Sequence, residues 1–445
     1  MTDPTTALHF PPDFVWGVST SAFQIEGAAD VDGKGPSIWD TFCRQPGAIA
    51  DASDGRVACE HYRRWADDLD LIQSLGVNAY RFSVCWPRVQ PTGQGAWNEA
   101  GLAFYDRLVD GMLARGLQPH LTLNHWDLPQ GLQDRGGWGN RETVDRFVDY
   151  ALGIQRRLGD RLASLCTHNE PWVVAVLGHQ NGVFAPGLKD EALALQVSHH
   201  LLLSHGRALK ALRAAGAKEK LGIVLNLAPT HPATPSAADK ARAVLEDGRL
   251  LRWYMDPLCQ GRYPLDIWLD LGEKAPKVHE GDLAEIRQPL DFLGVNYYSR
   301  SVQSADKPWD PKAAGKEVSE MGWEVYPEGL TELLLRLHRD YPQVPSLWVT
   351  ENGGAFPDPW VDGRVQDEAR TRYLQRHIAA VHAAKQEGVP VDAYMVWSLL
   401  DNFEWSSGYA KRFGIVHVDY ETQQRTPKDS ARWYRQFLAA QAKGA

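Results

Sequence analysis

The chain of 445 residues is 44% hydrophobic and 23% charged, a composition typical of a soluble globular protein. Because acidic residues outnumber basic ones, 56 to 47 with a formal charge of −9, and Lys and Arg form no cluster, we expect no nucleic-acid partner. No apolar run reaches the ~18 residues of a membrane-spanning helix, and Met1 to Phe10 lack the basic stretch and apolar core of a secretory leader, so we expect a cytoplasmic protein without a membrane partner.

Eight short runs of apolar, β-branched or aromatic residues recur along the chain and predict eight β-strands. They cover residues 14–19, 77–82, 118–123, 165–169, 221–227, 293–298, 347–350 and 391–398.

Amphipathic segments lie between the runs and predict helices. In residues 100–115, Tyr105 and Val109 belong to an apolar stripe with helical spacing, and Asn98 is the candidate N-cap. Residues 142–158 carry a similar stripe.

This alternation predicts parallel strands joined by right-handed crossovers, and eight such units close into a (β/α)₈ TIM barrel. An open doubly wound sheet is the alternative, but it would normally carry a Gly-rich phosphate loop, and neither GxGxxG nor GxxxxGK[ST] occurs. A minimal barrel needs about 250 residues, so long βα loops must take up much of the chain. Pro- and Gly-rich stretches such as 44–55 and 305–320 look like such loops, and we predict a single domain over residues 1–445.

Two predicted strands end on glutamate, at Glu170 in Thr-His-Asn-Glu-Pro and at Glu351 in Thr-Glu-Asn-Gly. Strand ends of a barrel meet at one mouth, so both carboxyl groups would face the same space. Glycoside hydrolysis requires such a pair, one to protonate the leaving oxygen and one to act at the anomeric carbon. The alternative is that each carboxylate forms a structural salt bridge.

Other polar residues are predicted to point into the same barrel. Asn296 and Tyr298 lie two apart on one strand and so share a face, with Tyr297 toward the helices. An inward Arg81 is costly unless it is paired, and Glu351 is the partner we expect.

Metal and nucleophile motifs are lacking in the sequence. There is no HExxH and no GxSxG, and the three histidines at 199, 200 and 205 are expected on a helix. We therefore expect neither a metal nor a cofactor. The five cysteines are scattered and are interpreted as reduced thiols. The 17 tryptophans exceed what packing usually requires, so some are candidate sugar platforms.

Taken in order, seven motifs resemble the glycoside hydrolase family 1 β-glucosidases over nearly the whole chain. They are Phe14-Val15-Trp16-Gly17 leading to Gln24-Ile25-Glu26-Gly27, Tyr80-Arg81-Phe82-Ser83, His125-Trp126-Asp127, Asn169-Glu170-Pro171-Trp172, Asn296-Tyr297-Tyr298-Ser299, Thr350-Glu351-Asn352-Gly353, and the run from Trp397 to Trp405.

The resemblance implies a retaining, exo-acting β-glucosidase without cofactor, acting on small β-glycosides or short oligosaccharides. It implies Glu351 as nucleophile and Glu170 as acid/base, with Arg81 and Tyr298 keeping Glu351 ionised. It also implies that sugar hydroxyls bind Gln24, His125, Asn169, Glu404 and Trp405, that Trp397 forms the floor of the site and that Trp323 is the leaving-group platform. Trp126, Asn296 and Phe413 complete the predicted substrate site.

Three residues depart from the family pattern, namely His168, Cys85 and Gly354, and none removes a catalytic group. The related 6-phospho-glycosidases carry Ser where Glu404 stands, with a Lys and a Tyr downstream. Lys411 matches them, whereas Glu404 and Phe413 do not, so we favour unphosphorylated β-glucosides, with galactosides or fucosides also accepted. A 6-phospho-glycosidase and a non-catalytic sugar-binding barrel are the alternatives, and the sequence does not decide between hydrolysis and transglycosylation.

Overall fold

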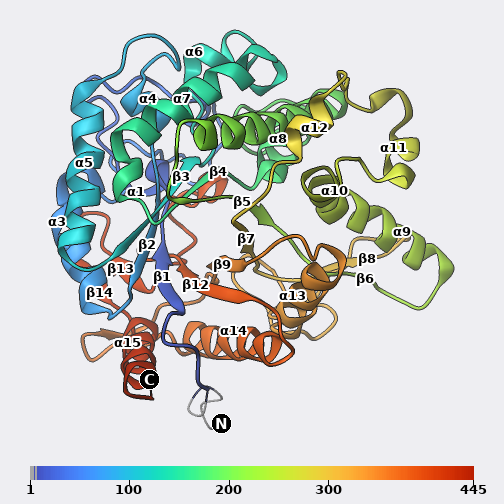
Figure 1. Cartoon of the computed structure of the whole chain (residues 1–445). Helices are drawn as coiled ribbons and strands as arrows, with labels where there is room; N and C mark the ends of the chain where they lie inside the picture. Colours follow the sequence, from blue (N-terminus) through green and yellow to red (C-terminus); the bar gives the residue numbers. More distant parts are fainter. Residues whose placement is uncertain (1–4, 6–7, 445) are drawn as a thin grey trace.

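The computed structural model describes residue 5 and residues 8–444. Most of the Met1–Phe10 segment, in which we expect no leader, lies outside these residues. Eight parallel strands form a closed barrel at the centre of the molecule (Figure 1). Around the barrel their order is β1 (Val15–Ser19), β12 (Val391–Trp397), β9 (Leu347–Asn352), β7 (Phe292–Asn296), β5 (Lys220–Asn226), β4 (Ser164–Asn169), β3 (Gln118–Asn124) and β2 (Ala79–Ser83).

All eight predicted strands are present, and their ends move by no more than two residues. The TIM barrel is therefore confirmed and the open sheet is excluded, because β1 pairs with both β2 and β12. β12 and β9 close against each other with Val396 opposite Asn352. Register shifts interrupt β4/β5 and β7/β9 near the carboxyl ends of the strands, and β9/β12 both at the start of β12 and near its carboxyl end.

Helices surround the barrel and cover its outer surface (Figure 1). The longer ones are α3 (His61–Ser74), α5 (Glu99–Ala114), α7 (Glu142–Leu158), α8 (Glu191–Ala214), α13 (Glu328–Asp340), α14 (Glu368–Gln386) and α15 (Asp429–Gly444). A separate group after β5 consists of α9 (Ala237–Asp247), the π-helical η4 (Gly248–Arg252), α10 (Trp253–Gln260), α11 (Leu265–Leu271) and α12 (Asp282–Ile286).

Shorter elements lie in the loops. They are the helices α1 (Ala22–Ile25), α2 (Ile38–Phe42), α4 (Trp86–Val89) and α6 (Gln130–Gln133), the 3₁₀ turns η1 (Gly137–Gly139), η2 (Gly159–Arg161), η5 (Gly272–Lys274) and η6 (Trp405–Ser407), and the π-helix η3 (Val173–Gln180). Three small sheets pair β6 (Thr230–Pro232) with β8 (Ser301–Gln303), β10 (Trp360–Val361) with β11 (Arg364–Val365), and β13 (Val416–Val418) with β14 (Arg425–Pro427).

The predicted helix at 142–158 matches α7, and the one at 100–115 matches α5 within one residue. The capping role expected of Asn98 is wrong. Asn98 occupies the N-cap position, but its side chain donates to the carbonyl oxygens of Asp32 and Arg88 instead of accepting from the helix. Its amide thus ties the start of α5 to two neighbouring loops.

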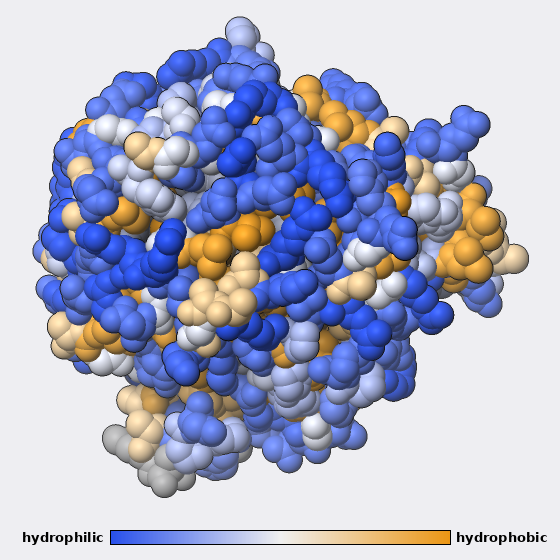
Figure 2. Space-filling view, turned by 45° about the horizontal axis from the view of Figure 1, so that its top comes forward, coloured by the Kyte–Doolittle hydropathy of each residue, from blue (hydrophilic) through white to orange (hydrophobic). Residues whose placement is uncertain are grey.

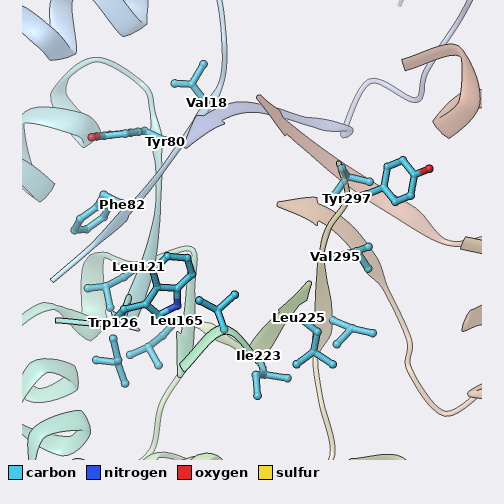
Figure 3. Packing of buried hydrophobic residues seen from close by; sticks show 14 of the residues in the cluster. Val18, Tyr80, Phe82, Leu121, Trp126, Leu165, Ile223, Leu225, Val295 and Tyr297 are labelled. Atoms are coloured by element: carbon cyan, nitrogen blue, oxygen red, sulfur yellow. The ribbon is translucent and has the colours of Figure 1, made fainter. Parts of the chain in front are cut away.

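The core has two layers, one on each side of the barrel wall. Outward-facing side chains such as Val295 and Tyr297 pack between strands and helices (Figure 3). Inward-facing Phe292 stacks on Trp348, with ring centroids 4.0 Å apart, in an apolar layer that fills the barrel interior. The alternation along β7 follows the two-residue period of a strand, so Asn296 comes to lie inside the barrel, past this apolar layer.

The surface seen in Figure 2 is mainly hydrophilic, with hydrophobic side chains in small separate groups. None of the helices formed by residues 8–444 combines the length and the apolar composition that crossing a bilayer requires.

Candidate active site

A cavity of about 490 Å³ opens at the carboxyl ends of the barrel strands. It is lined by all of the predicted site residues except Gln24, Arg81 and Asn169, which are buried directly behind its wall. The apolar layer inside the barrel closes the space beneath Arg81. The cavity is therefore a pocket with one open end.

Glu351 is the second-last residue of β9 and is surrounded by hydrogen-bond donors. The Arg81 guanidinium donates to its Oε1 at 2.7 Å, and the Tyr298 hydroxyl donates to its Oε2 at 2.5 Å. Burial raises the pKa of Glu351, while the charge of Arg81 and these two hydrogen bonds oppose that rise. The expected Arg81–Glu351 pair is thus confirmed, with both side chains almost fully buried.

Glu170 follows β4 and has a different environment. Its Oε1 accepts from the Asn296 amide at 2.6 Å, and it forms no ion pair with any described residue. Burial, and secondly the negative charge of Glu351, raise the pKa of Glu170 to about 8. Of the two carboxyl groups, Glu351 is thus better suited to hold the negative charge and Glu170 to hold the proton.

Asn169 links the two carboxyl groups through its amide oxygen, which accepts from Arg81 at 2.7 Å and from Asn296 at 3.0 Å. The Trp126 indole donates to the Asn169 carbonyl at 2.8 Å and fixes the end of β4. The expected orientations of Asn296 and Tyr298 into the site, and of Tyr297 toward the helices, are confirmed.

Three site residues have left-handed backbone conformations, which non-glycine residues rarely adopt. The φ angles are 78° at Trp126, 50° at Glu170 and 47° at Trp405. Such strain persists only where the surroundings enforce it, and it clusters at functional sites.

Aromatic rings form much of the pocket wall. The His125 ring lies nearly parallel to Trp397 and Trp405, at 17° and 14°, and burial lowers its pKa well below the usual range, so it is neutral. Nearer the opening, Tyr298, Trp323 and Phe413 pack together, and Trp323 is 37% exposed. Flat apolar faces of this kind suit the C–H face of a sugar ring.

Glu404 lies in the segment after β12, beside Gln24. The Gln24 amide donates to the Phe403 carbonyl at 2.9 Å and to Glu404 at 3.4 Å. Burial, and secondly the charge of Glu351, raise the pKa of Glu404 to about 8.

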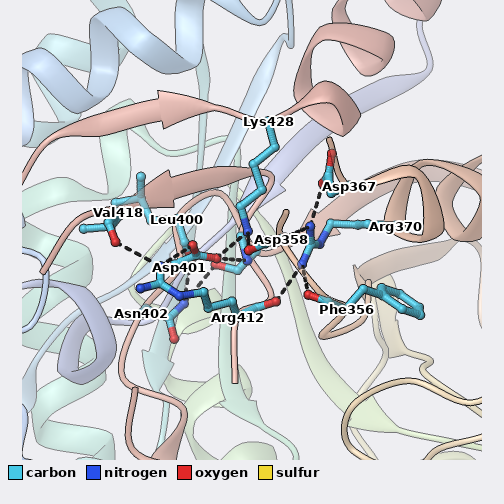
Figure 4. A network of polar contacts seen from close by, with 12 residues as sticks. Phe356, Asp358, Asp367, Arg370, Leu400, Asp401, Asn402, Arg412, Val418 and Lys428 are labelled. Atoms are coloured by element: carbon cyan, nitrogen blue, oxygen red, sulfur yellow. Dashed lines mark hydrogen bonds and ion pairs between the residues drawn. The ribbon is translucent and has the colours of Figure 1, made fainter. Parts of the chain in front are cut away.

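Residues 398–413, here called the β12 segment, are anchored from behind by a buried ionic network (Figure 4). Asp401 accepts from Lys428 at 2.8 Å and from Arg412 at 2.7 Å. Lys428 also binds Asp358, which in turn pairs with Arg370. The segment that carries Glu404, Trp405 and Phe413 is thereby tied to α14 and to the start of α15.

His168, which departs from the family pattern, faces away from the site. Its ring stacks on Phe147 at 4.5 Å and lies within hydrogen-bond distance of Ser204 on α8. The histidines at 199, 200 and 205 also lie on α8 as expected. Within the described part of the chain, no group of three or more His, Cys, Asp or Glu side chains is placed to hold a metal ion.

Sequence reasoning missed several residues of the pocket wall. Trp172 is the last residue of the motif that contains Glu170, a signal that could have identified it. Asn226 ends β5, so the position at a strand end could have identified it as well. The others come from loops and from the helices after β5, where no spacing marks them: Phe184, Glu246, Leu250, Arg300 and Met321.

Comparison with known proteins supports the resemblance. The family model for glycosyl hydrolase family 1 matches residues 6–443. The chain is 46% identical to β-glucosidase A of Acetivibrio thermocellus, with 97% of this chain and 98% of the relative covered, and 44% identical to a bifunctional β-D-glucosidase/β-D-fucosidase of Bifidobacterium breve, with 97% and 98% covered. Its fold is similar to a solved Thermotoga maritima β-glucosidase in complex with glucoimidazole, with a TM-score of 0.93, 43% identity, and 97% and 99% of the two chains covered. The chain belongs to glycosyl hydrolase family 1.

Proposed function

We propose that this protein is a retaining, exo-acting β-glucosidase that releases terminal β-D-glucosyl residues. The observation that carries the proposal is the pair of buried carboxyl groups in one pocket, Glu351 beside a cation and Glu170 without one. Membership of a retaining family and relatives named β-glucosidase support the same reaction.

In the first step, Glu351 attacks the anomeric carbon while Glu170 gives its proton to the glycosidic oxygen, and the leaving group departs. This forms a covalent glycosyl-enzyme on Glu351. In the second step, Glu170, now ionised, takes a proton from water, and the water oxygen displaces Glu351. Glu351 is a carboxylate before the attack and again after its release, and Arg81 and Tyr298 stabilise its charge at both stages.

The pocket favours an uncharged sugar. Its lining includes the acidic residues Glu170, Glu246, Glu351 and Glu404 and a single arginine, Arg300, among the described residues. The Arg300 guanidinium is already bound by Glu324 at 2.8 and 2.9 Å. A 6-phosphate group would lose its hydration in this pocket and find no free cation among the described lining residues, so this lining supports plain glucosides over phosphorylated ones.

The closed end of the pocket supports exo action. Since packed side chains fill the barrel beneath it, a sugar chain can enter only by its end. Small β-glucosides and short oligosaccharides are the proposed substrates. Tolerance for β-fucosides is supported by the relative named as both glucosidase and fucosidase. The five cysteines, all unpaired, support a cytoplasmic location.

The test uses aryl β-glucosides with good and poor leaving groups. Glu351→Gln should abolish turnover on both. Glu170→Gln should impair the poor leaving group far more, because only that group needs protonation. Near wild-type turnover by Glu351→Gln would refute the nucleophile assignment, and equal losses for Glu170→Gln would refute the acid role.

A second comparison measures initial rates on 4-nitrophenyl β-glucoside and its 6-phosphate. Faster turnover of the plain glucoside is expected. Preference for the phosphate would make the protein a 6-phospho-glycosidase. Sugar binding without turnover of either compound would leave only the non-catalytic barrel.

A further inference from the structure

A second cavity, of about 190 Å³, lies beside the active-site pocket, and we call it the side cavity. It is enclosed by η3, α8, α9 to α11 and η4, and Figure 1 shows α9, α10 and α11 grouped on one side of the barrel. Trp172 and Glu246 line both cavities and lie where the two cavities adjoin. A single water needs only about 10–15 Å³ of such space, so the side cavity has room for a small organic molecule.

The charges of the side cavity balance. Glu191 and Glu246 oppose Arg242 and Arg249 in its lining. Arg249 is held in place by Asp270 at 2.8 Å and Glu191 at 3.5 Å. Neither an anion nor a cation is favoured by such walls, which suit a polar but uncharged ligand.

Three polar groups in these walls have no partner among the described residues. The half-buried Glu246 carboxylate forms no hydrogen bond or ion pair, and the Tyr254 hydroxyl forms none although Tyr254 is only 2% exposed. The Arg249 Nε is buried and also unpaired. Polar groups that line a cavity without a protein partner are available to fix the orientation of a ligand. A ligand that both donates, to Glu246, and accepts, from Tyr254, would pair with these two groups.

Aromatic rings supply the remaining chemistry. Trp172, Trp253 and Tyr254 all line the side cavity. A hexopyranose combines an apolar C–H face with hydroxyl groups that donate and accept, which matches rings alternating with unpaired polar groups.

We propose that the side cavity binds one uncharged hexopyranose unit, across Trp172 and Glu246 from the active site. This inference rests on the proposed function in one respect, namely that the hexopyranose is a glucosyl unit. Two sources share this chemistry, namely the distal ring of a longer oligosaccharide substrate and free glucose released by the reaction. The experiment below distinguishes them.

The test fills the side cavity without touching the active-site pocket. Ala194 on α8 is buried and lines the side cavity but not the active-site pocket. Ala194→Met should occupy its space. Ala192→Met, on the exposed face of the same helix, is the matched control. Tyr254→Phe removes one hydroxyl at nearly constant volume, and so tests the site even where Ala194→Met fails to fold.

The first readout is the kcat/KM ratio of cellotriose to cellobiose, with 4-nitrophenyl β-glucoside as reference. If a substrate ring occupies the side cavity, wild type should favour the trisaccharide about tenfold, equivalent to ~1.4 kcal/mol. Ala194→Met should abolish that preference and Tyr254→Phe reduce it, with turnover of the aryl glucoside unchanged.

The second readout is calorimetric titration of glucose into protein whose active site is saturated with glucoimidazole. If free glucose occupies the side cavity, wild type and Ala192→Met should bind it and Ala194→Met should not. The proposal is overturned if wild type gives neither signal, or if the signal survives both Ala194→Met and Tyr254→Phe. Failure of wild type to hydrolyse the aryl glucoside would instead refute the proposed function, and glucose titration would still test the side cavity.

Discussion

Glu170 combines burial with a neighbouring negative charge, and both stabilise its protonated form. Because the raised pKa is about 8, Glu170 as the proposed general acid should lose its proton as pH rises through that value. We expect kcat/KM for a substrate with a poor leaving group to fall along an alkaline limb near pH 8. The measurement is a pH–rate profile, with an activated leaving group as control because it does not depend on the acid step. An unchanged kcat/KM up to pH 10 would contradict the acid assignment.

The same shift has a consequence for stability. The folded protein keeps a proton on Glu170 between the ordinary value of 4.5 and about 8, where the unfolded chain has lost it. The folded state binds more protons in this window, so the free energy of unfolding should decrease as pH rises from 4.5 to 8. Glu170→Gln should remove part of this decrease, as measured by urea unfolding at pH 5 and pH 8. An equal pH dependence in variant and wild type would argue against the shift.

Arg81 is the partner that makes a charged Glu351 tolerable inside the barrel. Removing one member of a buried ion pair typically costs about 3–5 kcal/mol. Arg81→Gln should therefore lower the free energy of unfolding by about that amount at pH 8. At pH 5 the loss should be smaller, because the pKa of the unpaired Glu351 rises and a proton neutralises it. Equal losses at the two pH values, by urea unfolding, would show that Glu351 does not carry the charge.

At the residue scale, simple rules predicted the polar centre of the site. The cost of an unpaired inward arginine predicted the Arg81–Glu351 pair, and two-residue periodicity oriented Asn296 and Tyr298. The left-handed conformation at Glu170 has no such signal. It lies at the end of β4 beside the hydrogen bond from Trp126 to the Asn169 carbonyl, a tertiary contact that no local residue pattern reports.

At the element scale, the β12 segment depends on the ionic network behind it. Lys428→Met leaves Arg412 as the one direct cationic partner of Asp401 and Arg370 as that of Asp358 among the described residues. The buried network thus loses one positive charge. We expect the free energy of unfolding to fall by about 3–5 kcal/mol. Because the segment carries Glu404, KM for 4-nitrophenyl β-glucoside should rise more than kcat falls.

Two variants separate positioning from simple loss of stability. Lys428→Arg keeps the charge and should recover much of the KM. Arg432→Met removes a half-exposed ion pair with Asp429 on α15 and should cost no more than about 1 kcal/mol. A Lys428→Met enzyme with wild-type KM would show that the network does not set the geometry of the segment.

Elements with strong periodicity were predictable, and those without it were not. The apolar stripe in residues 142–158 predicted both ends of α7 correctly. The three two-stranded sheets and the helices α9 to α11 lie in the long segments outside the barrel strands, where tertiary contacts determine the conformation. Much of the side cavity is built from α9 to α11 and η4, so no sequence motif predicted it.

At the scale of the whole molecule, barrel closure brings residues from distant parts of the chain into contact. β9 and β12 meet at the mouth, where the Trp397 carbonyl approaches Gly353 directly after β9 ends. A Cβ atom at Gly353 would lie 1.7 Å from that carbonyl oxygen. Glycine is therefore required here because the two backbones nearly touch.

Gly353→Ala tests whether this close approach sets both stability and activity. The added methyl group must push β9 and β12 apart, and overpacking of this kind typically costs about 1–3 kcal/mol. Since Glu351 and Trp397 flank the contact, kcat/KM should fall together with the free energy of unfolding. Gly354→Ala is the matched control, because the atoms nearest to its Cβ belong to the Phe356 side chain, at 2.6 Å, and not to a strand backbone. If urea unfolding and aryl-glucoside kinetics gave equal effects for the two variants, the contact between the strand ends would not be what positions the nucleophile.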